Sequence, residues 1–385
     1  MIILSGFSLF SQQYSYISSV INIEVPVRVY KGSDFVDTLG LQDFELTEDG
    51  VLQKIEAVYL VKKTSIQKEE GPKKFQPQVS RHFVLLFELT HYLPRVEQAI
   101  DAFFENVIQP ADMLTVVTPL KTYKFNSQVL ARIPKKNIAG ELKQKLRFDV
   151  EIASAEYKNA LRQLQEIWID SDTELDLKVT TYANFMAKLE TLRQVDQKKL
   201  TDFADFLKKT AGQKYVYLFY EREVVPQIDL QTISEVVSLN QDRQDILMNI
   251  SDLFELFRRE VTFNVDTVKK AFSDSSITVH FLFITETRSR DDDITMARPT
   301  GMRMTEASED IYGAFNQIAQ ATGGIVDSSA NPVVSFQKAV DASDNYYLIY
   351  YSPQNYTADG KFREIKVKVK SGSYHISHRA GYFAN

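Results

Sequence analysis

Two glutamates, Glu88 and Glu221, each follow a short apolar run in the sequence. The runs are Phe83–Phe87 and Tyr215–Tyr220, and helix-like sequence follows each of them. Such runs are typical of strands in a parallel α/β sheet, in which the carboxyl ends of the strands place polar groups at one edge. We therefore expect a ligand site at that edge. Two carboxylates that converged on one pocket there could also act as the acid and base pair of a hydrolase.

The first of these runs and both ends of the chain carry a resemblance to a known family. The residues that carry it are Val25–Val29, Asp43–Gly50, Gln53–Ile55, Phe83–Tyr92, Tyr346–Pro353, Asp359–Phe362 and Arg379–Phe383. Taken together, they resemble the von Willebrand factor A-related family of secreted proteins described from acidobacteria. The resemblance covers most of the chain outside residues 140–180 and 228–275, where helical sequence is inserted.

The resemblance implies a metal site at the carboxyl edge of the sheet. In a von Willebrand factor A-type domain, Asp-x-Ser-x-Ser after the first strand holds a divalent metal. The same five positions of this chain, from Glu88 to Tyr92, read Glu-Leu-Thr-His-Tyr. The middle loop of such a domain should add a threonine, for which Thr180 or Thr181 is the best candidate.

The fourth strand of such a domain should end in Asp-Gly, and this chain has Glu221-Arg222 there. By resemblance, Glu88, Thr90, Thr181 and Glu221 would then be the ligands of Mg²⁺ or Mn²⁺. Magnesium prefers oxygen ligands in near-octahedral geometry and keeps several waters, so a carboxylate with two short hydroxyls suits it.

The substitutions weaken this metal site. Glu88 is one methylene longer than aspartate, and Tyr92 places a ring where a small serine should stand. The guanidinium of Arg222 would compete with a cation for the same carboxylates. We therefore expect a binding edge without a cofactor, and an Mg²⁺ or Mn²⁺ site is the alternative. The expected edge residues are Glu88, Thr90, Tyr92, Thr181, Glu221 and Arg222.

Both ends of the chain have the pattern of strands with one buried face. Apolar and polar residues alternate in Ile23–Tyr30 and again in Glu364–Lys370. Segments of about 40 residues rarely sustain a core of their own. We therefore predict that residues 14–62 and 344–385 form one discontinuous β-sandwich.

Between these ends, residues 63–80 are polar, contain two prolines and are predicted to be a linker. From residue 81 to residue 343, strand-like and helix-like segments alternate. Strands are expected at 83–88, 114–118, 122–125, 215–220, 277–284 and 324–327, and helices near 94–108, 136–210, 308–322 and 333–342. This order predicts an α/β fold, a von Willebrand factor A-like doubly wound, mostly parallel sheet flanked by helices and inserted into the β-sandwich.

Composition excludes several functional classes. The net charge of −6 argues against nucleic-acid binding, because phosphate neutralisation needs a concentrated basic surface. The chain contains no cysteine, which rules out disulfides, thiolate metal sites and cysteine nucleophiles. Residues 1–13 are apolar at first but too short to span a bilayer, and we interpret them as the remnant of a signal peptide. A frayed terminus is the alternative.

The resulting hypothesis is a non-enzymatic, exported module, periplasmic or extracellular, that binds a protein or peptide through the carboxyl edge of its sheet. Three alternatives remain open at this point. They are a metal-dependent adhesion module, a hydrolase that uses Glu88 and Glu221, and a structural subunit of an envelope assembly. The sequence does not identify the partner.

Overall fold

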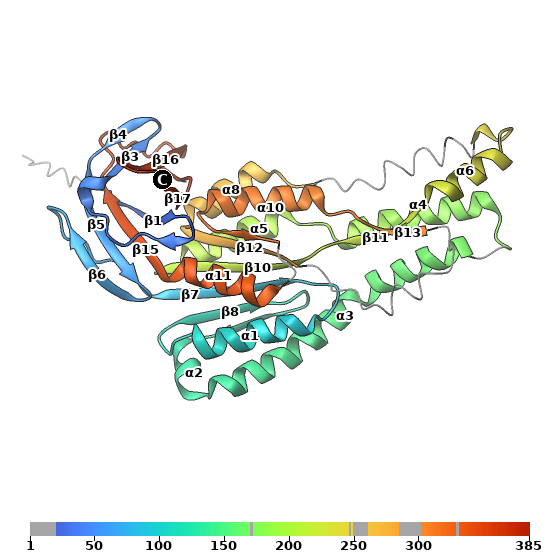
Figure 1. The fold of residues 1–385 in the computed structure, drawn as a ribbon, viewed down its shortest axis with the longest axis horizontal. Helices are drawn as coiled ribbons and strands as arrows, with labels where there is room; N and C mark the ends of the chain where they lie inside the picture. The colour runs from blue at the N-terminus through green and yellow to red at the C-terminus, as the bar shows by residue number, and fades with distance from the viewer. Residues whose placement is uncertain (1–20, 170–171, 246–247, 249–260, 285–301, 329–330) are drawn as a thin grey trace, which may run out of the picture.

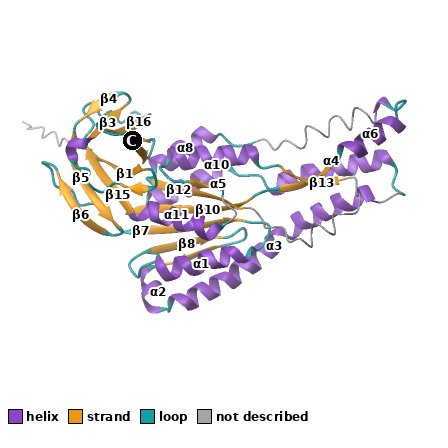
Figure 2. Cartoon of the chain, in the orientation of Figure 1, coloured by secondary structure: helices purple, strands orange, loops and turns teal. Residues whose placement is uncertain are grey.

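The computed structural model describes residues 21–385 except 170–171, 246–247, 249–260, 285–301 and 329–330. The expected signal-peptide remnant at residues 1–13 lies outside the described residues. β-sheets form one end of the elongated molecule, a helix-covered sheet forms its middle, and a mainly helical arm projects from the other end (Figures 1 and 2). Among the described residues, no helix is both long enough and apolar enough to cross a membrane.

Two antiparallel sheets at one end combine strands from both ends of the chain. The first has the order β17-β1-β15-β5-β6, with β2 paired to β1, and the second has the order β18-β16-β3-β4. The strands of the first are β1 (Ile23–Lys31), β2 (Asp34–Phe35), β5 (Ile55–Lys62), β6 (Ser65–Glu70), β15 (Asn345–Tyr351) and β17 (His375–His378). Those of the second are β3 (Phe44–Glu48), β4 (Val51–Gln53), β16 (Phe362–Val369) and β18 (Gly381–Phe383), and a 3₁₀ turn, Leu41–Asp43, precedes β3.

The two sheets share one hydrophobic core. Val25 and Val27 of β1 and Tyr347 of β15 pack with Leu46 of β3 and Ile365 of β16, all of them buried. The alternation seen in the sequence therefore places one side of each sheet in this core, because side chains along a strand alternate between its faces. Strand β15 lies between β1 and β5 and joins the carboxyl-terminal segment to the amino-terminal one.

The linker predicted at residues 63–80 is partly wrong. Ser65–Glu70 forms strand β6, which pairs antiparallel with β5 and is the edge of its sheet. Its side chains are exposed apart from that of Glu70, which is half-buried, and Lys68 and Glu70 form an ion pair across 2.6 Å. Charged residues are common on edge strands because they discourage pairing with other chains, so a polar sequence is compatible with a strand here.

The middle of the molecule is a six-stranded sheet with the order β14-β12-β10-β7-β8-β9. Its strands are β7 (Arg81–Glu88), β8 (Met113–Val117), β9 (Thr122–Phe125), β10 (Gln213–Glu221), β12 (Ile277–Ile284) and β14 (Val326–Asp327). All neighbouring pairs are parallel except β8 with β9. The first strand of this sheet along the chain is β7, at its centre. The chain then adds β8 and β9 on one side of β7, returns to place β10 on the other side, and adds β12 and β14 beyond β10. This is the doubly wound strand order.

Helices cover both faces of this sheet (Figure 1). One face packs on α1 (Pro94–Asn106), α2 (Ser127–Arg132), the first half of α3 (Lys135–Ile169) and α11 (Pro332–Asp344). The other packs on α5 (Gln197–Lys208), α8 (Val265–Asp274) and α10 (Glu309–Ala321). Burial on both faces explains why β7, β10 and β12 read as continuous apolar runs rather than alternating ones.

Helix α3 extends beyond the sheet, and its second half forms part of the arm. This half packs on α4 (Leu175–Leu192). The same cluster includes residues of α6 (Leu230–Leu239) and of β11 (Val224–Ile228), which pairs with β13 (Met302–Glu306) in a two-stranded ribbon. Within residues 228–275, where the sequence predicts inserted helices, α8 packs on the sheet and α6 does not. Helix α6 buries Ile233 and Val236 against the arm instead. Periodicity shows that a helix has an apolar face but not which surface covers it.

Buried arginines join the β-sheets to the amino end of the middle sheet. Arg81, 1% exposed, begins β7 and forms ion pairs with Asp112 at 2.8 Å and with Asp344 at 2.9 Å. Arg28 of β1 donates to the backbone carbonyls of Ala342 and Gly323, at the carboxyl ends of α11 and α10. A cation at a helix carboxyl end is favoured by the unpaired carbonyls and the helix dipole.

Replacing Arg81 by methionine should destabilise the protein by about 3–5 kcal/mol, because Asp112 would remain buried without its partner. Urea unfolding followed by circular dichroism would measure this change. The matched control is Lys62→Met, which removes an ion pair with Asp37 whose two side chains are 42% and 45% exposed. The control should leave the unfolding midpoint unchanged, since exposed ion pairs contribute little. Equal effects of the two substitutions would contradict this account.

Candidate functional site

The ends of β7 and β10 bring the two predicted glutamates to the same edge of the sheet. The strands are parallel neighbours, and Tyr220 lies opposite Glu88 in their register. Glu88 is exposed at the end of β7, whereas Glu221 is 3% exposed at the end of β10. The chain leaves β7 toward one side of the sheet and β10 toward the other, so this edge is the point at which the strand order reverses.

The carboxylate of Glu221 organises the loop after β7. Its Oε2 accepts hydrogen bonds from the backbone N–H of Thr90 (2.5 Å), from the Thr90 hydroxyl (2.9 Å) and from the backbone N–H of His91 (2.9 Å). Its Oε1 lies 2.7 Å from Nδ1 of His91. Both oxygens are therefore occupied by groups of the protein, and the loop is held against β10.

These contacts control the protonation of Glu221. Burial raises the pKa of its carboxyl, but the hydrogen bonds and charge of His91 and the backbone donors of the loop outweigh burial, and the pKa lies below its ordinary value. The ionised form is thus the stable one in the folded protein. A general acid needs a raised pKa, so in the acid and base pair of the hydrolase hypothesis Glu221 could serve only as the base.

Arg193 supplies a buried positive charge to the same edge. It is the carboxyl cap of α4, and its side chain is 9% exposed. The guanidinium lies 3.2 Å from the carboxylate of Glu223 and donates to the backbone carbonyl of Glu221 at 3.4 Å. It also lies over the rings of Tyr157 and Tyr220, at 5.7 and 5.2 Å from their centroids.

The acids and rings around Arg193 stabilise its charge. Burial lowers the pKa of the guanidinium, but the electrostatic effects of Tyr220, Tyr157, Glu88 and Glu221 raise it by more, so the net shift of this pKa is upward. Glu223 is 6% exposed and also accepts the Tyr220 hydroxyl at 2.5 Å. The carboxyl edge thus contains an internal cation surrounded by three acids.

Sequence reasoning missed Arg193, His91 and Glu223. It assigned the internal counter-ion to Arg222, which instead pairs with Glu306 at 3.2 Å and lies over the Phe283 ring. Residues 221 and 223 lie on the same side of an extended segment, whereas residue 222 points away, because side chains alternate along a strand. The sequence alone, through this alternation, could have placed Glu223 on the same side as Glu221. Arg193 comes from a helix whose position the sequence did not determine.

Two further candidates lie away from the Glu221 carboxylate. Tyr92 donates its hydroxyl to Glu97 of α1 at 2.7 Å, and its ring faces the guanidinium of Arg147 at 4.8 Å. Thr181 was expected in a loop, but it lies within α4, one residue before Tyr182, whose hydroxyl binds the Pro226 carbonyl in the arm. Of the expected site residues, the structure brings Thr90 into contact with Glu221 and places Glu88 nearby.

The observed arrangement does not fit a divalent cation. The carboxylate of Glu221 is already bonded to donors of the Thr90–His91 loop, and Arg193 provides the positive charge that a metal would supply. Within the described part of the chain, no group of three or more His, Asp or Glu side chains is placed to hold a metal ion. A cation at this edge would have to displace several bonds within the protein.

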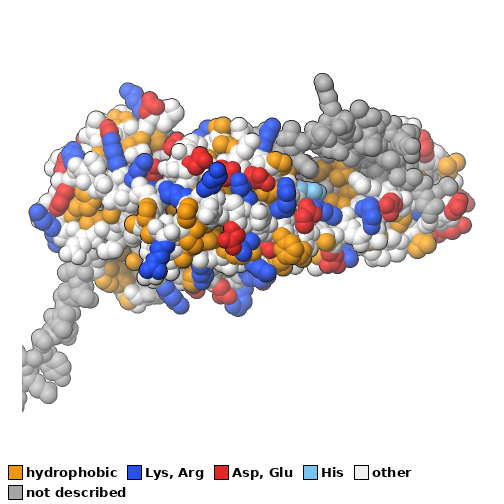
Figure 3. All heavy atoms as spheres, turned by 90° about the horizontal axis from the view of Figure 1, so that it is seen from below, with side chains coloured by type: hydrophobic (Ala, Val, Ile, Leu, Met, Phe, Trp, Pro, Cys, Tyr) orange, Lys and Arg blue, Asp and Glu red, His pale blue; other side chains and the backbone are white. Residues whose placement is uncertain are grey.

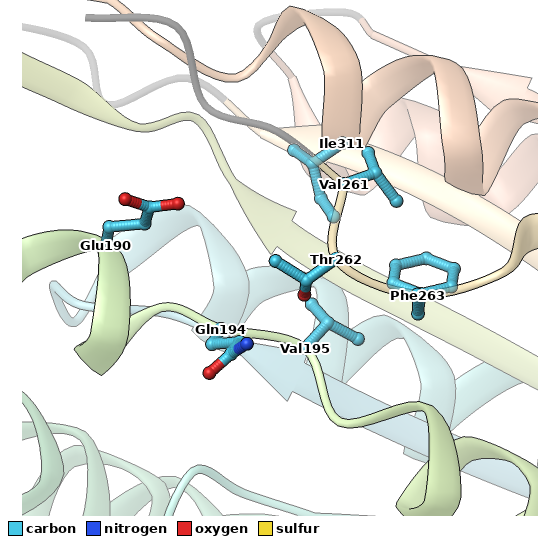
Figure 4. A pocket seen from close by; sticks show the side chains of 7 residues that line it. All are labelled: Glu190, Gln194, Val195, Val261, Thr262, Phe263 and Ile311. Atoms are coloured by element: carbon cyan, nitrogen blue, oxygen red, sulfur yellow. The ribbon is translucent and has the colours of Figure 1, made fainter. Parts of the chain in front are cut away.

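A shallow pocket lies beside this edge, between the end of α4, the segment before α8, and α10 (Figure 4). It encloses about 230 Å³, part of which is open solvent. Its lining residues are Glu190, Gln194, Val195, Val261, Thr262, Phe263 and Ile311. The pocket is apolar on the side of Phe263 and polar on the side of Glu190, and it is small for a drug-sized ligand.

A buried serine–histidine pair elsewhere in the sheet is not a catalytic centre. Nε2 of His280 lies 3.0 Å from the hydroxyl of Ser343, which also accepts from Tyr217 at 3.0 Å and donates to the Ala339 carbonyl. His280 and Ser343 are both 0% exposed, and burial lowers the pKa of His280 well below its ordinary value. Substrate cannot reach these groups, which satisfy one another's hydrogen bonds.

Comparison with known proteins does not identify the family of this chain. The sequence matches no family model, and no curated protein matches it. Among solved structures, the chain is similar to the human COPII-coat protein Sec24c, with a TM-score of 0.33 and 8% identity over 80% of this chain and 44% of that one. The chain therefore spans less than half of that protein, and a likeness this weak supports no conclusion about fold or function.

Substituting Glu221 by glutamine should destabilise the protein, and the loss should depend on pH. Because the folded protein depresses the pKa of Glu221 below its ordinary value of 4.5, its ionisation contributes fully above that value and is lost as the pH falls toward the folded pKa. The stability difference between wild type and Glu221→Gln should therefore be constant above about pH 5 and shrink as the pH falls below 4.5, where free histidine is charged. Denaturant titrations at each pH would measure it, and a constant difference would contradict the assignment.

Proposed function

We propose that this chain is a non-enzymatic, exported binding module: a von Willebrand factor A-like α/β domain inserted into a β-sandwich. It binds a protein or peptide at the carboxyl edge of the middle sheet, and binding does not depend on a metal. The doubly wound strand order, the helices on both faces and the sheets shared by the chain termini support the domain assignment. Export rests on the family resemblance and the apolar amino terminus.

The observation that carries the proposal is the position of the edge groups between β7 and β10. In doubly wound sheets, ligands bind outside the carboxyl ends of the strands, where the strand order reverses. Glu88, the Thr90–His91 loop, Glu221 and Arg193 lie at that position in this chain. A partner at this edge would meet the exposed carboxylate of Glu88 and the half-exposed imidazole of His91.

Arg193 supports binding without a metal. In a metal-dependent adhesion module, the cation links the acids of the module to a carboxylate of the partner. Here the acids Glu221 and Glu223 are compensated by groups of the protein itself. The edge is therefore preorganised before a partner arrives, and recognition depends on complementary shape and hydrogen bonding.

A metal titration would test this independence. Mg²⁺ or Mn²⁺ added to chelator-treated protein should produce no binding heat in calorimetry and no shift in melting temperature, because a ligand of the native state must stabilise it. Sub-millimolar binding that disappears in Glu221→Gln would contradict the proposal and restore the metal-dependent alternative. Glu364→Gln, at an exposed position of β16 in the β-sandwich, is the matched control for loss of one carboxylate.

Selection of binding peptides would test the edge itself. Peptides selected from a displayed library in the presence of a chelator should lose at least about tenfold in affinity, or 1.4 kcal/mol, for Glu88→Lys. They should bind Glu364→Lys, the same charge reversal in the β-sandwich, as tightly as wild type. Peptides that bind both variants equally would show that the edge is not the binding surface.

A further inference from the structure

Helix α3 has an apolar stripe on its outward face as well as on its inward face. The inward side chains Leu142, Leu146 and Val150 pack in the core against α1 and the sheet. On the opposite side, Phe148 and Ile152 are 59% and 48% exposed. They stand four residues apart, so they are neighbours on one helix face, and exposed Ala155 continues the stripe.

The surface that includes α3 mixes apolar and charged side chains. Figure 3 views the molecule from below Figure 1, the side on which α1, α2 and α3 lie, and shows orange apolar side chains between blue and red charged ones. Single exposed apolar side chains are ordinary on protein surfaces. A large aromatic and a branched aliphatic side chain adjacent on one helix instead have the spacing of a helix–helix contact.

The charges beside this stripe are arranged symmetrically about its centre. Phe148 and Ile152 are centred on residue 150, and Lys145 and Glu156 stand about equally far before and after it. At about 100° per residue, Lys145 and Glu156 lie within about 20° of each other around the helix, so both flank the stripe on the same side. Glu151 and Arg147 flank it on the other side.

This arrangement fits a second copy of α3 that runs in the opposite direction. A two-fold axis near residues 150 and 151 places Phe148 against Ile152 of the second copy. It also places Lys145 beside Glu156 of the second copy, and the symmetry repeats each contact. Arg147 comes near Glu151 of the second copy on the other flank. A parallel pairing would instead set like charges at similar heights.

The existing partners of these charges do not prevent the pairing. Lys145 contacts Glu141 at 3.0 Å, and Glu156 contacts Lys188 at 2.9 Å. Glu151 contacts Lys158 at 3.0 Å, and Arg147 lies 3.8 Å from Glu97. The four flanking side chains are 41–65% exposed, and ion pairs of side chains exposed to this extent are exchanged at little cost.

We propose that the chain forms a two-fold symmetric homodimer in which the outward stripe of α3, residues Phe148, Ile152 and Ala155, packs antiparallel on the same stripe of a second copy. The stripe lies on the face of α3 that points away from the sheet, whereas Glu221 and Arg193 lie at the carboxyl edge of the sheet; Arg147, which flanks the stripe, lies over the ring of Tyr92 beside that edge. The dimer would carry two such edges.

Cross-linking of single cysteines would test the register. The chain contains no cysteine, so Glu151→Cys introduces a unique thiol close to the proposed axis. A short bis-maleimide should link two copies of this variant. Asn159→Cys, exposed on the same helix, is the control. Its two thiols would be about 25 Å apart along the helices at a rise of about 1.5 Å per residue, so it should remain unlinked. Linking of both variants or of neither would overturn the proposed register.

Sedimentation of the full chain would test the surface. The wild type should show a concentration-dependent dimer mass, and Phe148→Glu should be monomeric with an unchanged circular dichroism spectrum, since Phe148 is 59% exposed. Lys145→Glu and Glu156→Lys should each weaken the dimer, and the double substitution should restore it. A monomer at every concentration, or a dimer that persists in Phe148→Glu, would overturn the proposal. A protein that stays monomeric and binds a different helical protein through the α3 stripe would also overturn the proposal.

Discussion

The bond between a buried carboxylate and a loop fixes the geometry of the carboxyl edge. Glu221 ends the second central strand, and its two oxygens hold the backbone and side chains of Thr90 and His91. An ionised carboxylate is stable at 3% exposure only when donors surround it. The Thr90–His91 loop provides those donors, and the same hydrogen bonds to Glu221 fix the conformation of the loop.

Arg193 extends this compensation to the rest of the edge. Because it comes from the end of α4, the arm and the sheet are joined through the guanidinium that binds Glu223 and the backbone of Glu221. At the amino end of the same sheet, Arg81 and Arg28 make an equivalent connection to the β-sheets. Buried arginines thus join the middle sheet to its neighbours at both ends, and the planar guanidinium suits this role because it offers several donors in a fixed geometry.

The sequence was sufficient for the strands and helices that are both long and apolar. The runs that end at Glu88 and Glu221 and the strand at Ile277–Ile284 were located because burial on both faces leaves an unbroken apolar pattern. The helix after Pro94 was located because its apolar residues recur at helical spacing. Strand β6 was missed, since an exposed edge strand of charged residues has the composition of a linker. The surface on which α6 packs could not be predicted, because an apolar helix face does not identify the surface that covers it.

Only the part of the candidate site that lies at the ends of strands could be predicted from the sequence. The convergence of Glu88 and Glu221 follows from parallel strands, but the bonds of Glu221 to His91 and the approach of Arg193 depend on side-chain geometry and on the length of α3 and α4. A double-mutant cycle of Arg193→Met and Glu223→Gln tests the central claim, internal compensation of the edge, most directly. The account predicts that unfolding free energies of the four proteins give a coupling of at least about 1 kcal/mol, because the two groups form one buried pair. Additive effects, with no coupling, would contradict it.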